Sequence, residues 1–166
     1  MDKKFTVIRD TREKDGFGWE FGPNEIFSPT LIKKLDSGDY SLLGYEREIS
    51  IERKKNTAEL AKNIFEPRFE KELKRLEDYK FSYIVCEFTY DDLLTFPVNS
   101  GIPKKLWWKV KMSSKFLHST ITRYLIQYHT KILFVGKCGK DCVEQIFKSF
   151  INYEIKNFSM AIKKGV

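Results

Sequence analysis

The chain of 166 residues is poor in cysteine and histidine, with three of the former and two of the latter. So few cysteines exclude the disulfide framework of a small secreted domain and fit a reducing compartment. No segment approaches the roughly 20 consecutive apolar residues of a membrane helix. Residues 1–4 are not followed by the apolar stretch of a secretory signal. We therefore expect a cytoplasmic protein without a membrane partner.

Acidic residues are scarce in the second part of the chain. Residues 97–166 carry 13 Lys and Arg but only 3 Asp and Glu, whereas residues 1–96 carry 17 and 20. The formal net charge of the whole chain is +7. A basic part beside an acidic, metal-capable part suits a metal-dependent enzyme that acts on a polyanion, although the same charge would also serve solubility alone.

The remaining composition predicts one folded domain over residues 1–166. Apolar residues make up 42% and aromatic residues 15% of the chain, which is enough for a substantial core. The alternation of apolar strands with helical periodicity predicts an α/β fold, with helices flanking a mixed central sheet. We expect strands at 5–9, 31–35, 40–43, 49–54, 81–88 and 131–135, and helices at 58–65, 69–76, 114–128 and 141–155.

Residues 38–55 contain the most informative pattern. In a strand over 49–54, Glu52 and Lys54 share one face because side chains alternate with a period of two. A hairpin would bring Asp39 beside them. Two carboxylates can hold Mg²⁺ or Mn²⁺, and a lysine can orient an attacking water or offset charge on a phosphoryl oxygen. A solvated edge hairpin would show the same charges, so this pattern alone does not decide the function.

Two further strand ends carry acidic residues. Asp10 and Glu13 follow the first strand, and Glu87 stands at the end of the strand over 81–88. Reactive groups of open α/β sheets lie at strand ends, so Asp10 and Glu13 are candidates to complete an acidic cluster. Charged surface turns would give the same pattern.

A basic segment with two tryptophans lies at 103–115. Lysines can neutralise phosphates, and the rings of Trp107 or Trp108 can stack on bases. In the alternative, the segment begins an amphipathic helix whose tryptophans are core residues. The candidates for nucleic-acid contact in this segment are Lys104, Lys105, Trp107, Lys109 and Lys111.

Five segments taken in order resemble the nuclease domain of the XPF family of structure-specific endonucleases. They are Val-Ile-Arg-Asp-Thr-Arg-Glu (7–13), Leu-Asp-Ser-Gly-Asp-Tyr-Ser-Leu (35–42), Ile-Glu-Arg-Lys (51–54), Arg-Phe-Glu-Lys-Glu-Leu (68–73) and Ile-Val-Cys-Glu (84–87). Glu-Arg-Lys after Gly-Asp-Tyr is the most specific part.

The resemblance implies a restriction-endonuclease-like fold and divalent-metal-dependent cleavage of DNA, in branched, flap or fork structures during repair, recombination or replication. It implies metal ligands at Asp10, Asp39 and Glu52, a catalytic lysine at Lys54, and an acidic site that also includes Glu13. Arg53 belongs to the motif, but strand alternation turns it away from Glu52, so we expect it to support the site. Arg12 is a further candidate for contact with DNA.

The chain departs from the family pattern in two respects. Relatives often place an aspartate shortly after Glu-Arg-Lys, where this sequence offers only Glu59, so either Glu59 replaces it or the contact is absent. The sequence also contains neither a helicase domain nor a tandem helix-hairpin-helix module. It resembles the compact form of phages and bacteria, which implies the cytoplasm of a bacterium or of a phage-infected host. Family members often dimerise through their last helices, and the apolar stripe on 143–151 is compatible with that.

Two other functions stay open from the sequence. Some relatives of the family are non-catalytic DNA-binding or partner subunits. Such subunits usually lack the acidic and Glu-Arg-Lys residues, all of which are present here, so we favour an enzyme. RNA is the other possibility, since the metal chemistry would serve either phosphodiester and nothing in the sequence reads a 2′-hydroxyl.

Overall fold

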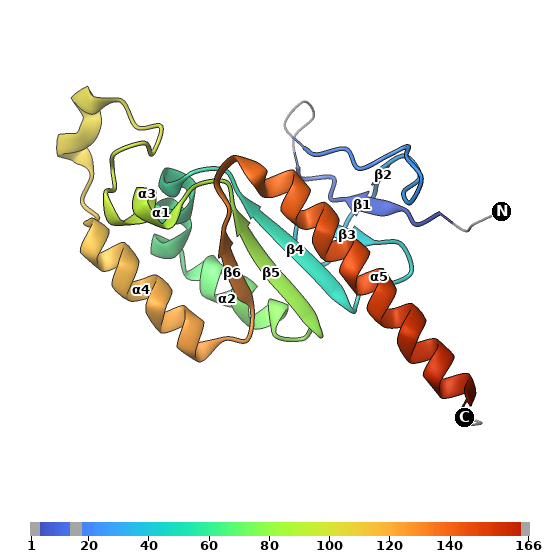
Figure 1. Cartoon of the computed structure of the whole chain (residues 1–166). Helices are drawn as coiled ribbons and strands as arrows, with labels where there is room; N and C mark the ends of the chain where they lie inside the picture. Colours follow the sequence, from blue (N-terminus) through green and yellow to red (C-terminus); the bar gives the residue numbers. More distant parts are fainter. Residues whose placement is uncertain (1–3, 14–17, 164–166) are drawn as a thin grey trace.

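The computed structural model describes residues 4–13 and 18–163, which form a six-stranded sheet with helices on both faces (Figure 1). The strands are β1 (Val7–Arg9), β2 (Leu31–Ile32), β3 (Tyr40–Leu42), β4 (Ile49–Lys54), β5 (Phe81–Cys86) and β6 (Lys131–Phe134). The helices are α1 (Thr57–Phe65), α2 (Pro67–Leu76), α3 (Tyr90–Leu94), α4 (Ser114–Gln127) and α5 (Gly139–Lys163), with 3₁₀ turns η1 (Lys104–Lys109) and η2 (Gly136–Cys138). This confirms the predicted α/β class and mixed central sheet.

The sheet is mixed, with the strand order β2-β1-β3-β4-β5-β6. β3 pairs antiparallel with both β1 and β4, while β4, β5 and β6 are parallel to one another. The carboxyl ends of β4, β5 and β6 therefore meet at one edge of the sheet. This edge leads into α1, α3 and η2, and it is where an open α/β sheet usually binds its ligand.

Two apolar clusters cover the two faces of the sheet. One joins α1, α2, α3 and α4 to β5 through residues that include Leu60, Phe69 and Ile84. The other joins α5 to β1, β3 and β4, and it contains Ile49, Ile51 and the α5 residues Val143, Phe147, Phe150 and Ile151. In Figure 1, α5 crosses one face of the sheet, and the other four helices lie on the opposite side.

β4 is buried along its whole length. Ile49 and Ile51 point into the α5 cluster, so Glu52 and Lys54 point to the opposite face, toward α1 and α2. The predicted alternation along this strand is therefore confirmed, and the Asp39 turn lies beside it because Asp39 N–H donates to the carbonyl of Ile51 at 2.7 Å.

α1 and α2 divide where the sequence predicts a break. Asn56 caps α1 by accepting the backbone N–H of Glu59 at 2.9 Å. Pro67 is the first residue of α2, where its missing N–H costs no helical hydrogen bond. The division angles two short helices over the cavity described below.

α4 ends at Gln127, one residue earlier than predicted. Ser113 caps the helix, because its hydroxyl accepts the N–H of Phe116 at 3.2 Å. Phe116 and Leu125 are about half exposed. They lie at the margins of the stripe that packs against the rest of the protein, and its members are Leu117, Thr120, Ile121 and Tyr124.

The last two elements also differ from expectation. β6 is only partly buried because it is the edge strand, paired with β5 alone. α5 is longer than expected, and its apolar stripe on 143–151 packs into the protein's own core, so that stripe offers no surface for a dimer. Among the described residues no helix combines the length and apolarity needed to cross a membrane.

Candidate active site

A cavity of about 280 Å³ opens between the β3–β4 hairpin and the helices α1 and α2. Its lining combines four carboxylates with four basic side chains. The carboxylates are Asp39, Glu52, Glu59 and Glu72, the basic residues are Arg12, Lys54, Arg68 and Arg75, and the others are Ser37, Gly38, Asn63 and Phe69. The structure thus brings together Asp39, Glu52 and Lys54, as the hairpin predicts.

Asp39 is positioned by the backbone on both of its sides. Gly38 precedes it with φ +79°, and a Cβ there would lie 2.3 Å from Oγ of Ser50, so only glycine fits this turn. The Asp39 carboxylate accepts the backbone N–H of Arg53 at 2.8 Å. Burial raises the pKa of Asp39 well above its usual value, and repulsion from Glu52 adds to the effect.

Glu52 and Lys54 form a buried ion pair, with 2.6 Å between Oε1 and Nζ. Burial raises the pKa of Glu52 to about 8, since the attraction of Lys54 only partly opposes the desolvation. Burial would lower the pKa of Lys54, but the pull of Glu52 and Glu72 outweighs it and raises that pKa above its usual value. Lys54 therefore stays a cation throughout the physiological range.

Glu72 is a site residue that the sequence reasoning missed. It lies on α2, interacts with the Glu52 carboxyl and raises the pKa of that group further. The many charged residues of α2 are, as a sequence pattern, typical of a solvated helix face. The available signal was spacing, because Glu72 stands three residues after the buried Phe69 and so borders the buried face.

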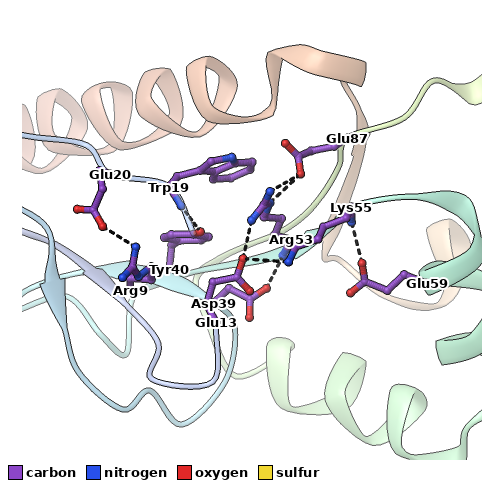
Figure 2. Close-up of polar contacts among 10 residues, drawn as sticks. All are labelled: Arg9, Glu13, Trp19, Glu20, Asp39, Tyr40, Arg53, Lys55, Glu59 and Glu87. Carbon is purple, nitrogen blue, oxygen red and sulfur yellow. Dashed lines mark hydrogen bonds and ion pairs between the residues drawn. The ribbon is translucent and has the colours of Figure 1, made fainter. Parts of the chain in front are cut away.

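Arg53 points to the opposite face of β4 and organises a second cluster (Figure 2). Its guanidinium donates to Glu13 at 2.5 Å and to Glu87 at 2.7 Å. It also lies 4.5 Å from the ring centroid of Trp19, which stacks on Tyr40. Arg53 therefore holds β4, β5 and the loop after β1 together, in agreement with the expected supporting role.

α5 begins directly against this second cluster. A Cβ on Gly139 would lie 2.8 Å from the ring of Trp19 and 2.9 Å from Cγ of Glu87. Trp19 and Phe21 are buried, so the aromatic residues of the loop after β1 pack onto the body of the protein. Residues 15–17 of that loop lie outside the described residues.

Asp10 and Glu13 do not line the cavity. Asp10 is fully buried, and its oxygens accept the N–H of Arg12 at 2.8 Å, Nε of Arg12 at 2.6 Å and the N–H of Leu35 at 2.6 Å. Burial would raise the pKa of Asp10, but these bonds outweigh it and lower the pKa. Asp10 thus places Arg12 at the cavity, while Glu13 binds Arg53. Metal binding by Asp10 stays a prediction from the resemblance.

Asp39 and Glu52 are suited in chemistry to a hard divalent ion. Mg²⁺ takes oxygen ligands and is usually bound by one or two carboxylates together with waters and substrate phosphates. Burial raises the pKa of both groups, and repulsion from neighbouring carboxylates adds to it. Within residues 4–13 and 18–163, no three of the His, Cys, Asp and Glu side chains are grouped closely enough to bind a metal by themselves. Glu59 lines the same cavity, and its replacement of the family aspartate stays a prediction.

The basic segment forms η1, at the end of the molecule opposite the C-terminus (Figure 1). The Trp107 indole N–H donates to the carbonyl of Ile102 at 2.9 Å, and the side chain is half-buried. The neighbouring Trp108 is the exposed ring of the pair, although the sequence analysis selected Trp107 for stacking. Lys104, Lys105, Lys109 and Lys111 are all exposed.

Comparison with solved structures shows the fold. XPF from Aeropyrum pernix in complex with DNA matches with a TM-score of 0.58 and 18% identity, over 91% of this chain and 66% of that one. XPF from Aeropyrum pernix without DNA matches with a TM-score of 0.55 and 18% identity, over 84% of this chain and 57% of that one. The match therefore spans less than two thirds of either XPF chain. It confirms the expected XPF-like, restriction-endonuclease-like fold. No protein family model and no curated protein matches the sequence.

Proposed function

We propose that this protein is a divalent-metal-dependent DNA endonuclease, a hydrolase of phosphodiester bonds that uses Mg²⁺ or Mn²⁺. The observation that carries the proposal is the cavity in which Asp39, Glu52 and Lys54 come together. An XPF structure with the same fold was determined with DNA, which supports DNA as the ligand class. The basic balance of residues 97–166 supports a polyanionic substrate in general.

Asp39 and Glu52 would hold the ion, which when bound would polarise the scissile phosphate and lower the pKa of a bound water. Both carboxyl groups must lose their protons to act as ligands. Their raised pKa values favour the protonated forms in the metal-free cavity, so ion binding and proton release are coupled.

Lys54 would stabilise charge on the phosphate and orient the attacking water. Its ammonium remains protonated because the neighbouring carboxylates raise its pKa. An ammonium fixed at 2.6 Å from Glu52 can stabilise negative charge that develops on a phosphoryl oxygen, and its N–H groups can orient the attacking water. Burial strengthens both effects because little solvent screens them.

Three arginines line the cavity and would bind the substrate phosphates. Arg12, Arg68 and Arg75 carry planar guanidiniums, which fit phosphate oxygens two at a time. Arg12 and Arg68 are largely exposed, so they can reach a bound strand without reorganising the core. We further propose branched, flap or fork DNA as the substrate, which would place the enzyme in repair, recombination or replication.

A side-by-side digest tests the substrate class. Matched DNA and RNA duplexes, flaps and forks are incubated with the purified chain in Mg²⁺, Mn²⁺ or EDTA. We expect cleavage of DNA in either metal, faster cleavage of flaps and forks than of duplex, and none in EDTA. Binding of DNA without cleavage in either metal would contradict the proposed enzymatic activity and favour a non-catalytic partner subunit. Equal or faster cleavage of RNA would overturn the DNA assignment.

Calorimetric titration with Mn²⁺ tests the proposed ligands without relying on activity. Asp39→Asn and Glu52→Gln should each weaken Mn²⁺ binding at least about 10-fold, because each removes a charged oxygen ligand. Glu48→Gln is the matched control, since Glu48 is exposed in the turn of the same hairpin. Unchanged Mn²⁺ affinity in both site variants would show that the metal does not bind in this cavity.

A further inference from the structure

η1 presents one large ring to the solvent. Trp108 is 79% exposed, more than any other aromatic side chain of the described residues. An indole ring buries a large apolar area when it packs against a partner, so Trp108 offers a large apolar face to a ligand. Truncation of Trp108 would remove little of the protein's own packing.

The turn that carries Trp108 is held in shape by its neighbours. Trp107 is anchored by its indole N–H to the carbonyl of Ile102. The N–H of Leu106 donates to the carbonyl of Pro103 at 2.8 Å, and the N–H of Val110 donates to that of Trp107 at 3.0 Å. These bonds fix the backbone on both sides of Trp108. Binding of a ligand to the ring therefore does not require an entropic cost for ordering the turn.

Positive charge surrounds the exposed ring. Nζ of Lys109 lies 5.1 Å from the Trp108 ring centroid, and Lys104 and Lys105 begin the same turn. In the part of the chain that the structure describes, none of these three lysines forms an ion pair with a carboxylate. Exposed aromatic faces beside unpaired lysines are the combination that binds single-stranded nucleic acid, since bases stack on the ring while the lysines meet the phosphates.

η1 also lies at the same edge of the sheet as the cavity. α1 follows β4 and lines the cavity with Glu59 and Asn63, and Phe65 ends this helix about 3 Å beyond Asn63 along its axis. The exposed ring of Phe65 stacks on that of Phe116 at the start of α4, with 6.3 Å between ring centroids. This exposed pair of rings therefore joins α1, which lines the cavity, to α4, which follows the η1 segment.

We propose that η1 is a binding site for unpaired nucleotides of a DNA substrate, with Trp108 stacking on a base and Lys104, Lys105 and Lys109 holding the adjacent phosphates. This inference deepens the proposed function and rests on it for the identity of the nucleic acid. Such a site would distinguish branched DNA from duplex, because a flap or fork supplies unpaired bases and a plain duplex does not.

A protein partner fits this surface less well. A stable protein interface buries about 800 Å² on each partner, and η1 offers a six-residue turn with one largely exposed ring. A base needs only one face of such a ring. The charge on η1 is also of one sign, which suits a phosphate backbone.

Intrinsic fluorescence gives a direct test. The chain has three tryptophans, of which Trp107 and Trp108 lie in η1 and Trp19 is buried elsewhere. A ligand that stacks on η1 should therefore change the fluorescence of Trp107 or Trp108. A 15-residue oligo(dT) is titrated into the full chain in EDTA, and the affinity for oligo(dT) and for a hairpin duplex is measured by anisotropy. We expect oligo(dT) to quench the wild-type protein, and Trp108→Ala to remove most of the quenching while Trp107→Phe retains it. Trp108→Ala should weaken oligo(dT) binding roughly 5- to 150-fold, the range for one lost base–aromatic stack.

The variants and probes separate stacking from simple charge. Trp108→Phe should recover at least half of the lost affinity on a logarithmic scale, because a phenyl ring also stacks. Duplex affinity should change less than about twofold in Trp108→Ala. Equal weakening of oligo(dT) and duplex, or equal quenching by poly-L-glutamate at the same charge concentration, would overturn the proposal.

The outcome is independent of cleavage. The titration is repeated with Glu52→Gln, for which we expect the same quenching by oligo(dT). A protein that cleaves DNA in Mg²⁺ but shows no quenching would overturn this inference and leave the nuclease assignment in place. Quenching that depends on Trp108 in a protein that cleaves nothing would overturn the nuclease assignment alone.

Discussion

The ammonium of Lys54 lies 2.6 Å from Oε1 of Glu52, and both side chains are buried beneath α1 and α2. The pair is unbalanced, because Asp39 and Glu72 add negative charge on the same side of the sheet. Burial raises the pKa of Glu52 and of Asp39, and repulsion between the carboxylates adds to the effect. The predictions below follow from these raised pKa values and from the way the surrounding strands are held.

The metal-free protein should become less stable as the pH rises. The pKa of Glu52 is about 8 in the folded state against 4.5 ordinarily, and that of Asp39 is raised as well. The folded state therefore binds more protons than the unfolded chain, and the stabilisation present below about pH 4.5 is lost as the pH passes through about 8. Lys54 is protonated in both states over this range and contributes no slope.

Thermal denaturation in EDTA between pH 5 and pH 9 checks this expectation. We expect the melting temperature to fall by about 4 °C or more, which corresponds to roughly 1–2 kcal/mol for a chain of this length. Glu52→Gln should flatten the fall, and Mn²⁺ at pH 8.5 should raise the melting temperature of the wild type. A melting temperature that rises with pH equally in both proteins would contradict the assigned charge state.

Arg53→Lys should destabilise the protein although it keeps the charge. One ammonium cannot replace the fork that binds Glu13 and Glu87 together, nor the planar contact with Trp19. We expect the free energy of unfolding in urea to fall by about 2–3 kcal/mol, within the range for broken partly buried charge networks. Arg47→Lys, an exposed change in the β3–β4 turn, is the control. Equal stability of the two variants would show that the network does not hold β4.

Part of this arrangement could be predicted from the sequence. The period of two along β4 separates Glu52 and Lys54 from Arg53, and burial of Ile49 and Ile51 fixes which side faces the core. Such local patterns need no knowledge of the rest of the fold. The limits of most elements and the mixed sheet follow from the same kind of evidence.

Other parts depend on contacts that sequence spacing does not contain. Glu72 lines the cavity because α2 packs beside the hairpin in the folded protein. The sequence of α2 alone, with its many charges, instead suggests a solvent-exposed helix face. Asp10 accepts the N–H groups of Arg12 and of the distant Leu35, a pairing that spacing after a strand end does not contain. The choice between Trp107 and Trp108 is set by one hydrogen bond to Ile102.

The lysines of the η1 segment should account for much of the salt dependence of DNA binding. Each phosphate that is neutralised on a duplex contributes about 0.9 to the slope of log K against log salt. Replacing Lys104, Lys105, Lys109 and Lys111 with Ala should therefore flatten the slope by about three to four units if all four reach phosphate. Mn²⁺ affinity at Asp39 and Glu52 should not change.

A second four-lysine variant controls for net charge. Lys33 follows β2, Lys131 lies on β6, and Lys148 and Lys156 lie on α5, so replacing these four lysines removes the same charge outside the η1 segment. Its slope should stay within about one unit of the wild type, the value of a single phosphate contact. Equal slopes for the two variants would mean that duplex DNA lies elsewhere, along Lys62, Arg68 and the neighbouring helix.

Single-turnover cleavage of a flap DNA substrate in Mg²⁺ by Asp39→Asn tests the central claim most directly. Asn keeps the shape of the side chain and removes its charge, and Asp141→Asn is a matched exposed control on α5. We predict that the wild type and Asp141→Asn cleave at similar rates, and that Asp39→Asn is at least about 100-fold slower while its melting temperature at pH 8 is equal or higher. Cleavage by Asp39→Asn at the wild-type rate would contradict the claim that this carboxylate and Glu52 form the active site.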